Sequence, residues 1–519
     1  MPTRKSWHVG AAGNNQNAMD TDLSAASQPR RRFRKRWIAW ALVAAWAGVG
    51  VWNTTKPMPA GSNVSSAPLV VPAGDVQFLY DLTHPQPQRP EQLLYEQHIF
   101  DEAFRIIDEA RSFVVADFFL LNESMGAAGA PHRQLSRQLV ERLIARKQAV
   151  PSLAVLLITD PINDVYGGAP SPLLAELRKA GIDVVVTDLE RMRDSNALYS
   201  SLWRTLLQWW GNSASGGGLS NPFTSDGSTI TLRSWLALLN FKANHRKLIV
   251  ADREDGTLAA LVTSANPHDA SSAHSNVGLR FTGALAGEIV ASEMAIARFS
   301  GWRGHIYAAA ADSAAPAQTQ GVAVSFITEE AIRRHLLDAI GATRNGDSVS
   351  IATFYLADRK ILGALLDAAQ RTVQVRVILD PNRDAFGRRK DGVPNRPVAN
   401  ELVTRSGERI QVRWYRTHGE QFHTKIAMVR RGDHFVASLG SANLTRRNLG
   451  NYNLEANLAI EAPTSSPLAI EMQGYFDRLW NNDGPPGTEY TAAFGAYRDE
   501  DKGKYWRYRL MEATGLSTW

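Results

Sequence analysis

Two segments carry nearly the same pattern: NHRKLIVAD at residues 244–252 followed by TSAN at 263–266, and FHTKIAMVR at 422–430 followed by GSAN at 440–443. In each, His-x-Lys opens an apolar run of strand length, and a turn of small residues ending in Asn follows. Residues two apart on a strand share a face, so each His points the same way as its Lys. The duplication predicts a repeated fold that brings two His-Lys pairs to one site.

The surroundings of the two motifs repeat as well. Predicted strands 113–121 and 348–356 match, and predicted strands 153–159 and 373–379 both end at Asp-Pro. Helical patterns alternate with these strands, which favours an α/β fold with two similar halves. The predicted order is a basic cytoplasmic tail (1–36), a transmembrane anchor (37–55), a linker (56–75), a first half (76–307), a linker (308–321), a second half (322–482) and a C-terminal tail (483–519).

The first half carries an insertion near residues 191–235, rich in Trp and Leu, that has no counterpart in the second half. A helix that caps the core is one interpretation. A lid, or a surface that dips into a bilayer, is the other, because interfacial helices favour Trp and Leu. The insertion holds few basic residues, which weakens the second interpretation.

The charge is concentrated at the N-terminus. Of 57 Lys and Arg and 51 Asp and Glu, eight basic and two acidic residues lie in 1–36, which leaves 49 of each sign in the rest. A folded part without net positive charge makes nucleic acid an unlikely partner. There is no Cys, which excludes disulfides and thiol catalysis.

An uncharged run, WIAWALVAAWAGVGVW at 37–52, follows the basic cluster 30–36. The positive-inside rule would keep this cluster in the cytoplasm, so we expect a single-pass anchor in the cytoplasmic membrane with the catalytic part outside, in the periplasm. A cleaved signal peptide is the alternative. Residues 1–29 are predicted to be disordered.

A His beside a Lys suits phosphate chemistry. Lysine supplies a positive charge for the non-bridging oxygens. One neutral imidazole can attack phosphorus, and a second, protonated one can give a proton to the leaving oxygen. Two histidines from opposite sides are needed, and a duplicated fold delivers them.

With these motifs the chain resembles the phospholipase D superfamily, whose signature is His-x-Lys-(x)4-Asp followed by a Gly-Ser-x-Asn-type turn. The expected anchored layout looks most like the bacterial phosphatidyltransferase and cardiolipin synthase branch. The resemblance covers about residues 76–482. It implies a duplicated phospholipase D-like fold, two mixed-sheet α/β/α halves with a shared active site at their interface. It also implies a phosphohistidine intermediate without metal or cofactor.

The same resemblance assigns the site residues. The catalytic candidates are His245, Lys247, Asp252, His423, Lys425 and Glu455, and the phosphate-contact candidates are Ser264, Asn266, Ser441 and Asn443. Glu455 is expected to orient His423, whereas the stretch aligned with it offers only Gly278 to His245. Arg430 replaces the second Asp of the signature. The family favours His245 as nucleophile, and a carboxylate beside His423 keeps the opposite assignment open.

We therefore expect an enzyme that acts on the phosphodiester of glycerophospholipids in a membrane, as a cardiolipin synthase-like phosphatidyltransferase or as a phospholipase D. A nuclease of the same fold is the first alternative. A catalytically inactive membrane scaffold is the second, and Arg430 and Gly278 motivate it. Hydrolysis versus transfer, the headgroup and the oligomeric state stay open.

Overall fold

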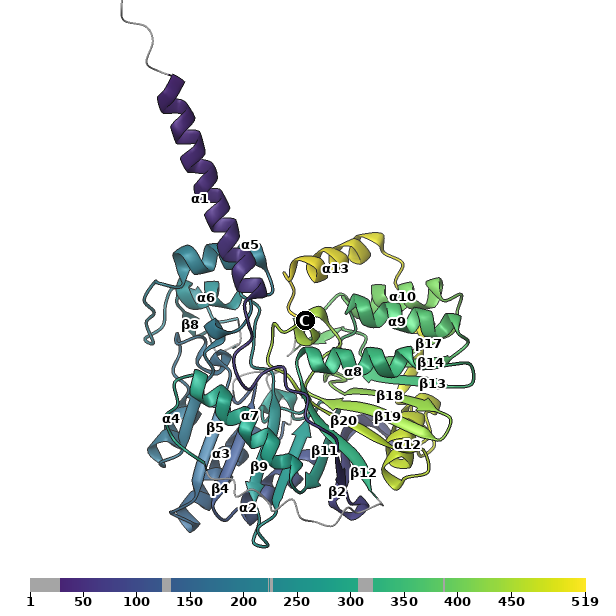
Figure 1. Cartoon of the computed structure of the whole chain (residues 1–519). Coiled ribbons are helices and arrows are strands. Elements are labelled where there is room, and N and C mark those ends of the chain that lie inside the picture. The colour runs from purple at the N-terminus through teal and green to yellow at the C-terminus, as the bar shows by residue number, and fades with distance from the viewer. Residues whose placement is uncertain (1–28, 124–131, 223, 225–226, 307–320, 386–387) are drawn as a thin grey trace, which may run out of the picture.

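The computed structural model describes residues 29–123, 132–222, 224, 227–306, 321–385 and 388–519. Most of the predicted tail 1–36 and nearly all of the predicted linker 308–321 lie outside the described residues. The described chain forms two large mixed sheets that are flanked by helices (Figure 1).

The first sheet has the strand order β3-β2-β11-β10-β9-β4-β5-β6. Its strands are β2 (Val76–Gln86), β3 (Arg89–Glu96), β4 (Phe113–Phe118), β5 (Ala154–Thr159), β6 (Asp183–Val186), β9 (Lys247–Asp252), β10 (Leu258–Thr263) and β11 (Asn276–Thr282). Strands β4, β5 and β6 run parallel, and the other pairs are antiparallel.

The second sheet repeats this order as β12-β20-β19-β18-β13-β14-β17, with β1 and β21 at its edges. Its strands are β1 (Leu69–Val71), β12 (Val322–Thr328), β13 (Ser348–Thr353), β14 (Gln374–Leu379), β17 (Ile410–Tyr415), β18 (Lys425–Arg431), β19 (His434–Gly440), β20 (Ala456–Pro463) and β21 (Thr491–Ala493). Parallel pairing is again confined to three neighbours, β13, β14 and β17. The α/β architecture with mixed sheets that the sequence predicts is therefore present.

Three apolar cores hold the layers together. One outer core joins the first sheet to its helices, and another joins the second sheet to its own. The central core contains buried side chains of both halves, such as Phe281 and Phe326, together with residues of α7 and α12. The main helices are α2 (Ile99–Glu109), α3 (Leu135–Ala149), α4 (Pro172–Lys179), α7 (Leu285–Phe299), α8 (Glu330–Gly341), α9 (Arg359–Gln370), α10 (Asn395–Arg405), α11 (Arg446–Leu449), α12 (Pro467–Asn481) and α13 (Lys502–Thr514). Burial of this shared apolar surface makes each half part of the other's core.

The segment predicted as a linker before the first half contributes a strand to the second sheet. Strand β1 pairs with β12, with Leu69 opposite Val324. Just before it, the Val64 N–H donates to Thr328 Oγ1 at 2.6 Å. At the other end of the chain, β21 pairs with β17. Both segments therefore belong to the folded body.

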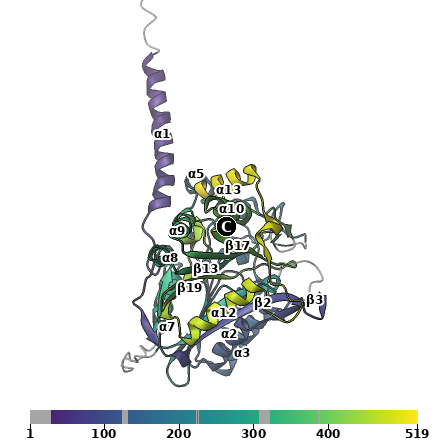
Figure 2. The ribbon, with the colours of Figure 1, turned by 90° about the vertical axis from the view of Figure 1, so that its right-hand side faces the viewer.

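The predicted transmembrane helix is wrong. Residues 37–55 lie in α1 (Pro29–Thr55), which projects from one end of the body in both ribbon views (Figures 1 and 2). Among the described residues, no helix combines the length and the apolarity that crossing a membrane requires. The uncharged run at 37–52 is only sixteen residues long and is flanked by Arg36 and by the polar residues 53–55. The expected location of the catalytic part stays a prediction.

The insertion packs against the end of α1. It comprises α5 (Ala197–Leu202), the π-helical turn η4 (Trp203–Leu207), β7 (Leu219–Ser220), β8 (Thr229–Ile230) and α6 (Leu232–Leu238). The Asp194 N–H donates to Asn53 O at 2.9 Å. Trp203 is buried in a small apolar cluster, whereas Leu206 and Trp209 are exposed. The smaller elements elsewhere are η1 (Ala73–Asp75), η2 (Pro161–Asp164), η3 (Leu189–Arg191), η5 (Asp269–Ser271), η6 (Phe494–Tyr497), β15 (Asp384–Ala385) and β16 (Arg388–Arg389).

The turn after each motif is closed differently in the two halves. In the second half, Gly440 has φ +152° and the Ala442 N–H donates to Asn457 Oδ1 at 3.1 Å. In the first half, Thr263 stands in place of Gly440 and its own Oγ1 accepts from the Ala265 N–H at 3.1 Å. A side chain at 440 would therefore compete with Asn457 for the same space.

Gly440→Ala is expected to lower the free energy of unfolding by about 1–3 kcal/mol, because an added Cβ would lie 2.3 Å from the Ala456 carbonyl oxygen in a strained backbone conformation. Gly363→Ala on α9 is the control. Among the described residues, no atom outside its own helix backbone and chain neighbours lies within 4 Å of its Cβ position. Replacing this helical glycine should raise the free energy of unfolding by about 0.5–1 kcal/mol. Urea unfolding of both variants measures the difference. Equal stabilities would contradict the close contact at Gly440.

Candidate active site

The two halves exchange backbone contacts where the motifs begin. The His245 N–H donates to Leu454 O at 2.8 Å, just before β20 of the second half. The Leu454 N–H in turn donates to Ala243 O at 3.0 Å, and the contact that mirrors this one is the Ser275 N–H donating to Gln421 O at 3.1 Å, just before β11 and the second motif. Each His-Lys segment is therefore docked on the opposite half, and the two motifs meet at the interface between the sheets.

His245 is oriented by Glu455 of the second half. Its Nδ1 lies 3.0 Å from a carboxylate oxygen of Glu455, which is fully buried. Ser441 Oγ and Asn448 Nδ2 also donate to this carboxylate. The sequence-based pairing of Glu455 with His423 is therefore wrong. The reason is the interface: the residue before β20 reaches across to the other half instead of back to its own motif.

His423 is oriented by Asn276, a residue that the sequence analysis missed. His423 Nδ1 lies 3.0 Å from Asn276 Oδ1. The Ser264 hydroxyl donates to the same oxygen at 3.0 Å, as Ser441 does to Glu455. Asn276 is thus the counterpart of Glu455, and the alignment with Gly278 was displaced by two residues. The matching serines could have revealed this register.

The two lysines are held alike. Lys247 Nζ donates to the carbonyl oxygen of His245 at 2.7 Å, and Lys425 Nζ donates to that of His423 at 2.9 Å. Each ammonium also lies over a phenylalanine ring, that of Phe119 at 5.2 Å and that of Phe354 at 5.6 Å. Both lysines are buried.

The same rings contact the histidines. Ring centroids are 4.9 Å apart for Phe119 and His245, and 5.2 Å apart for Phe354 and His423. Each phenylalanine follows the strand beside its motif, so the repeat places them alike. These apolar walls strengthen electrostatic interactions by excluding water.

Burial dominates the proton affinities of the site. It lowers the pKa of His245 to about 4 despite the opposing effect of Glu455, and it lowers the pKa of Lys247 to about 7. The pKa of His423 lies well below its usual value because of burial and the nearby Lys425 charge. Burial and the Lys247 charge likewise lower the pKa of Lys425. A bound anion between these groups would raise their pKa values and favour their protonated, positively charged forms.

Two buried aspartates hold the segments that lead into the motifs. Asp160 Oδ2 accepts from the Asn244 N–H at 2.7 Å, and Asp380 Oδ2 accepts from the Phe422 N–H at 2.8 Å. Burial raises the pKa of each carboxyl to about 7. The sequence analysis noted both only as strand ends. They fix the backbone on the N-terminal side of each histidine.

The remaining candidates divide into near and distant residues. Asn266 and Asn443 are buried in the turns after the motifs, and Asn266 Oδ1 accepts from the Leu120 N–H at 3.3 Å. Asp252 is not brought to the histidines. It lies at the far end of β9, where it accepts from the backbone N–H groups of residues 111–113. Its counterpart Arg430 is exposed, so the missing second Asp affects the scaffold and not the centre.

Among the residues that the structure describes, no group of three or more His, Asp or Glu side chains is arranged to hold a metal ion. The contacts of the two motifs bring together two imidazoles, two ammonium groups, one carboxylate and one amide. This set can bind a phosphate diester and exchange protons with its oxygens.

Comparison with known proteins gives a family for part of the chain. Residues 336–480 match the family described as cardiolipin synthase, PLD-like domain. No curated protein matches the sequence.

Similar solved structures extend over the rest of the chain. The phosphatidylserine synthase of Haemophilus influenzae Rd KW20 is 11% identical, with a TM-score of 0.53, and the match covers 86% of this chain and 97% of that one. The phospholipase D family member Nuc of Salmonella typhimurium is 21% identical, with a TM-score of 0.24, over 30% of this chain and 95% of that one. The first likeness is one of fold and includes both halves.

Proposed function

Because this chain is an enzyme of the phospholipase D superfamily, we propose that it transfers phosphatidyl groups between alcohols, with glycerophospholipids as substrates. One observation carries the proposal: each histidine is held through Nδ1 by a residue of the opposite half, which leaves its Nε2 available to a substrate phosphate. Two buried lysines beside them favour the charge of a phosphodiester. The folded part has no net positive charge, unlike most nucleic-acid binders.

The first step forms a phosphohistidine. Neutral His245 attacks phosphorus through Nε2, and the bond from phosphorus to the headgroup oxygen breaks. His423 donates a proton to that oxygen. We assign the nucleophile to His245 because Glu455 accepts its Nδ1–H and thereby raises the basicity of Nε2. Asn276 offers His423 only a neutral acceptor.

The second step reverses the proton transfer. His423 takes the proton of an incoming hydroxyl, the new oxygen–phosphorus bond forms, and the bond from phosphorus to His245 Nε2 breaks. A lipid hydroxyl gives a new phospholipid, and water gives phosphatidic acid. His423 is protonated before the first step because the bound phosphodiester anion raises its pKa.

The test is lipid turnover by the purified protein in phosphatidylglycerol vesicles, with single-stranded DNA as a competing substrate. Formation of cardiolipin and glycerol is the expected result. Phosphatidic acid alone would mean a hydrolase. Cleavage of DNA without turnover of lipid would contradict the proposal.

Glu455→Gln tests the assignment of the nucleophile through pH dependence. Burial and Glu455 act on the pKa of His245 in opposite directions, so removing the carboxylate lowers that pKa further. Since attack needs neutral His245, the acid-side fall of kcat/KM should move to lower pH. The plateau should drop by about 10²–10⁴-fold because the imidazole loses basicity and orientation.

Glu461→Gln is the matched control for Glu455→Gln, since Glu461 lies on β20 with a half-exposed side chain. Profiles of kcat/KM between about pH 2 and 8, which sample both sides of the His245 pKa of about 4, should be the same for the control and the unaltered enzyme. An unshifted acid limb in Glu455→Gln would contradict the role given to His245.

A further inference from the structure

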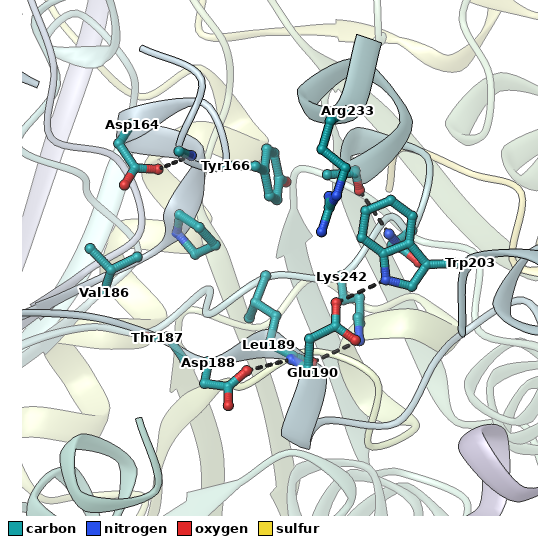
Figure 3. A pocket seen from close by; sticks show the side chains of 14 residues that line it. Asp164, Tyr166, Val186, Thr187, Asp188, Leu189, Glu190, Trp203, Arg233 and Lys242 are labelled. Atoms are coloured by element: carbon teal, nitrogen blue, oxygen red, sulfur yellow. Dashed lines mark hydrogen bonds between the residues drawn. The ribbon is translucent and has the colours of Figure 1, made fainter. Parts of the chain in front are cut away.

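A second pocket lies beside the first motif, under the insertion (Figure 3). It has a volume of about 280 Å³ and is lined by residues that follow β5 and β6 and by residues of η4 and α6. It adjoins the catalytic segment through Thr187, whose Oγ1 accepts from the Asn244 side chain at 3.0 Å. The catalytic chemistry described above uses none of its polar side chains.

Arg233 supplies the positive charge of this pocket. Its guanidinium lies 4.1 Å from the centroid of the Trp203 ring and points into the cavity between Trp203 and Tyr166 (Figure 3). Glu190 of the pocket pairs with Arg204, and within the described residues the buried Nε of Arg233 has no hydrogen-bond partner. Its Nη2 donates to Gln208 O at 3.3 Å. A guanidinium fixed on an aromatic ring with free donors is suited to a planar or tetrahedral oxyanion.

Asn240 supplies an unused acceptor. Its side chain is 8% exposed, and Nδ2 donates to Ala237 O at 3.1 Å. Within the described ranges its Oδ1 has no hydrogen-bond partner. A buried carbonyl oxygen without a donor is costly, so a ligand that brings a hydroxyl group would gain there.

The carboxylates of the pocket restrict the ligand further. Asp164 accepts from the Gly167 N–H at 2.9 Å, Asp188 from the Glu190 N–H at 3.0 Å, and Glu190 from Trp203 Nε1 at 2.9 Å. Lys242 is already engaged by Asp194 at 2.6 Å. A purely anionic ligand would be repelled by these carboxylates, whereas hydroxyl groups can donate to their remaining lone pairs.

We propose that this pocket binds a hydroxylated oxyanion, a phosphorylated polyol of the size of glycerol phosphate. The oxyanion lies against Arg233, and the hydroxyl groups donate to Asn240 Oδ1 and to the rim carboxylates. The same chemical group occurs as a free phosphate ester and as the headgroup of a phosphatidylglycerol.

Calorimetric titration tests the site apart from turnover. Glycerol 3-phosphate, inorganic phosphate, glycerol and dihexanoyl-phosphatidylglycerol are titrated into the His245→Ala protein, so that the lipid is not consumed. Glycerol 3-phosphate should bind more tightly than phosphate or glycerol. Arg233→Met should weaken it at least 10-fold, whereas Arg298→Met, an exposed arginine on α7, should not. Asn240→Leu should weaken glycerol 3-phosphate but not inorganic phosphate.

The lipid arm separates the two sources of the ligand. If dihexanoyl-phosphatidylglycerol binds and this binding is lost in Arg233→Met, the lipid headgroup occupies the pocket. If only glycerol 3-phosphate binds, the pocket is a site for a free phosphate ester. Unfolding midpoints show whether each variant is folded. No saturable binding of either phosphate ester, or equal affinity in a folded Arg233→Met protein, would overturn the proposal. Because binding is measured without turnover, failure of the proposed reaction would leave this test intact.

Discussion

Replacing His245 with Ala is expected to lower phospholipid turnover by about 10³-fold or more, because the nucleophile and its covalent intermediate are both lost. His423→Ala should give a different defect. The first step loses its acid, and the intermediate that still forms lacks the base that activates the incoming hydroxyl. A phospholipid labelled at phosphorus should therefore leave acid-labile label on the His423→Ala protein and none on the His245→Ala protein.

His434→Ala is the control for both histidine variants. His434 lies on β19 with a side chain that is 40% exposed and contacts Glu461, away from the centre. Its turnover should equal that of the unaltered enzyme. Label on the His245→Ala protein but not on His423→Ala would reverse the assignment of the two histidines. Unchanged turnover in both variants would contradict the catalytic proposal as a whole.

Arg246→Met is expected to cost about 3–5 kcal/mol of unfolding free energy, because it leaves buried charges without their partner. The Arg246 side chain is fully buried between the two halves. Nη1 lies 2.8 Å from Glu293, and Nη2 lies 3.0 Å from Glu329. The same Glu329 oxygen accepts from the Glu455 N–H at 2.9 Å, so this network also supports the partner of His245. Urea unfolding should show the loss, and catalysis should fall with it.

Arg253→Met is the matched control for Arg246→Met. Like Arg246, Arg253 forms two ion pairs, but its side chain is partly exposed. The free energy of unfolding of Arg253→Met should differ from that of the unaltered protein by no more than about 1 kcal/mol. Adding Glu293→Gln and Glu329→Gln to Arg246→Met should recover part of the stability, because the uncompensated charges are then removed. A cost for Arg246→Met as small as that of Arg253→Met would show that the network contributes little.

Local sequence patterns predicted much of the fold. Apolar strands and matched motifs were enough to predict an α/β fold with two similar halves, because strand pattern and turn chemistry are properties of neighbouring residues. The mixed sheets were implied by the family resemblance. The edge strands β1 and β21 were assigned to a linker and a tail, since their pairing with β12 and β17 depends on residues far away in the chain. The prediction of a transmembrane helix failed because it rested on the absence of charge in 37–52, a run of only sixteen residues with polar neighbours.

The candidate site residues that are neighbours in the sequence were predicted. The contacts that each histidine makes with the opposite half were missed. His245 with Lys247 and His423 with Lys425 are visible in the sequence because each pair lies on one strand. The partner of each histidine comes from the opposite half, and no spacing along the chain encodes that exchange. Asn276 was overlooked for this reason.

The crossed partners have a consequence for how the chain differs from an assembly of identical subunits. In a symmetric dimer of one half, both histidines would receive the same partner, either two carboxylates or two amides, and their proton affinities would be equal. In a single chain that contains two copies of the half, the partner of one histidine can be substituted while the partner of the other is kept. Glu455 and Asn276 are such a divergence. Covalent duplication thus allows one histidine to specialise in attack and the other in proton transfer.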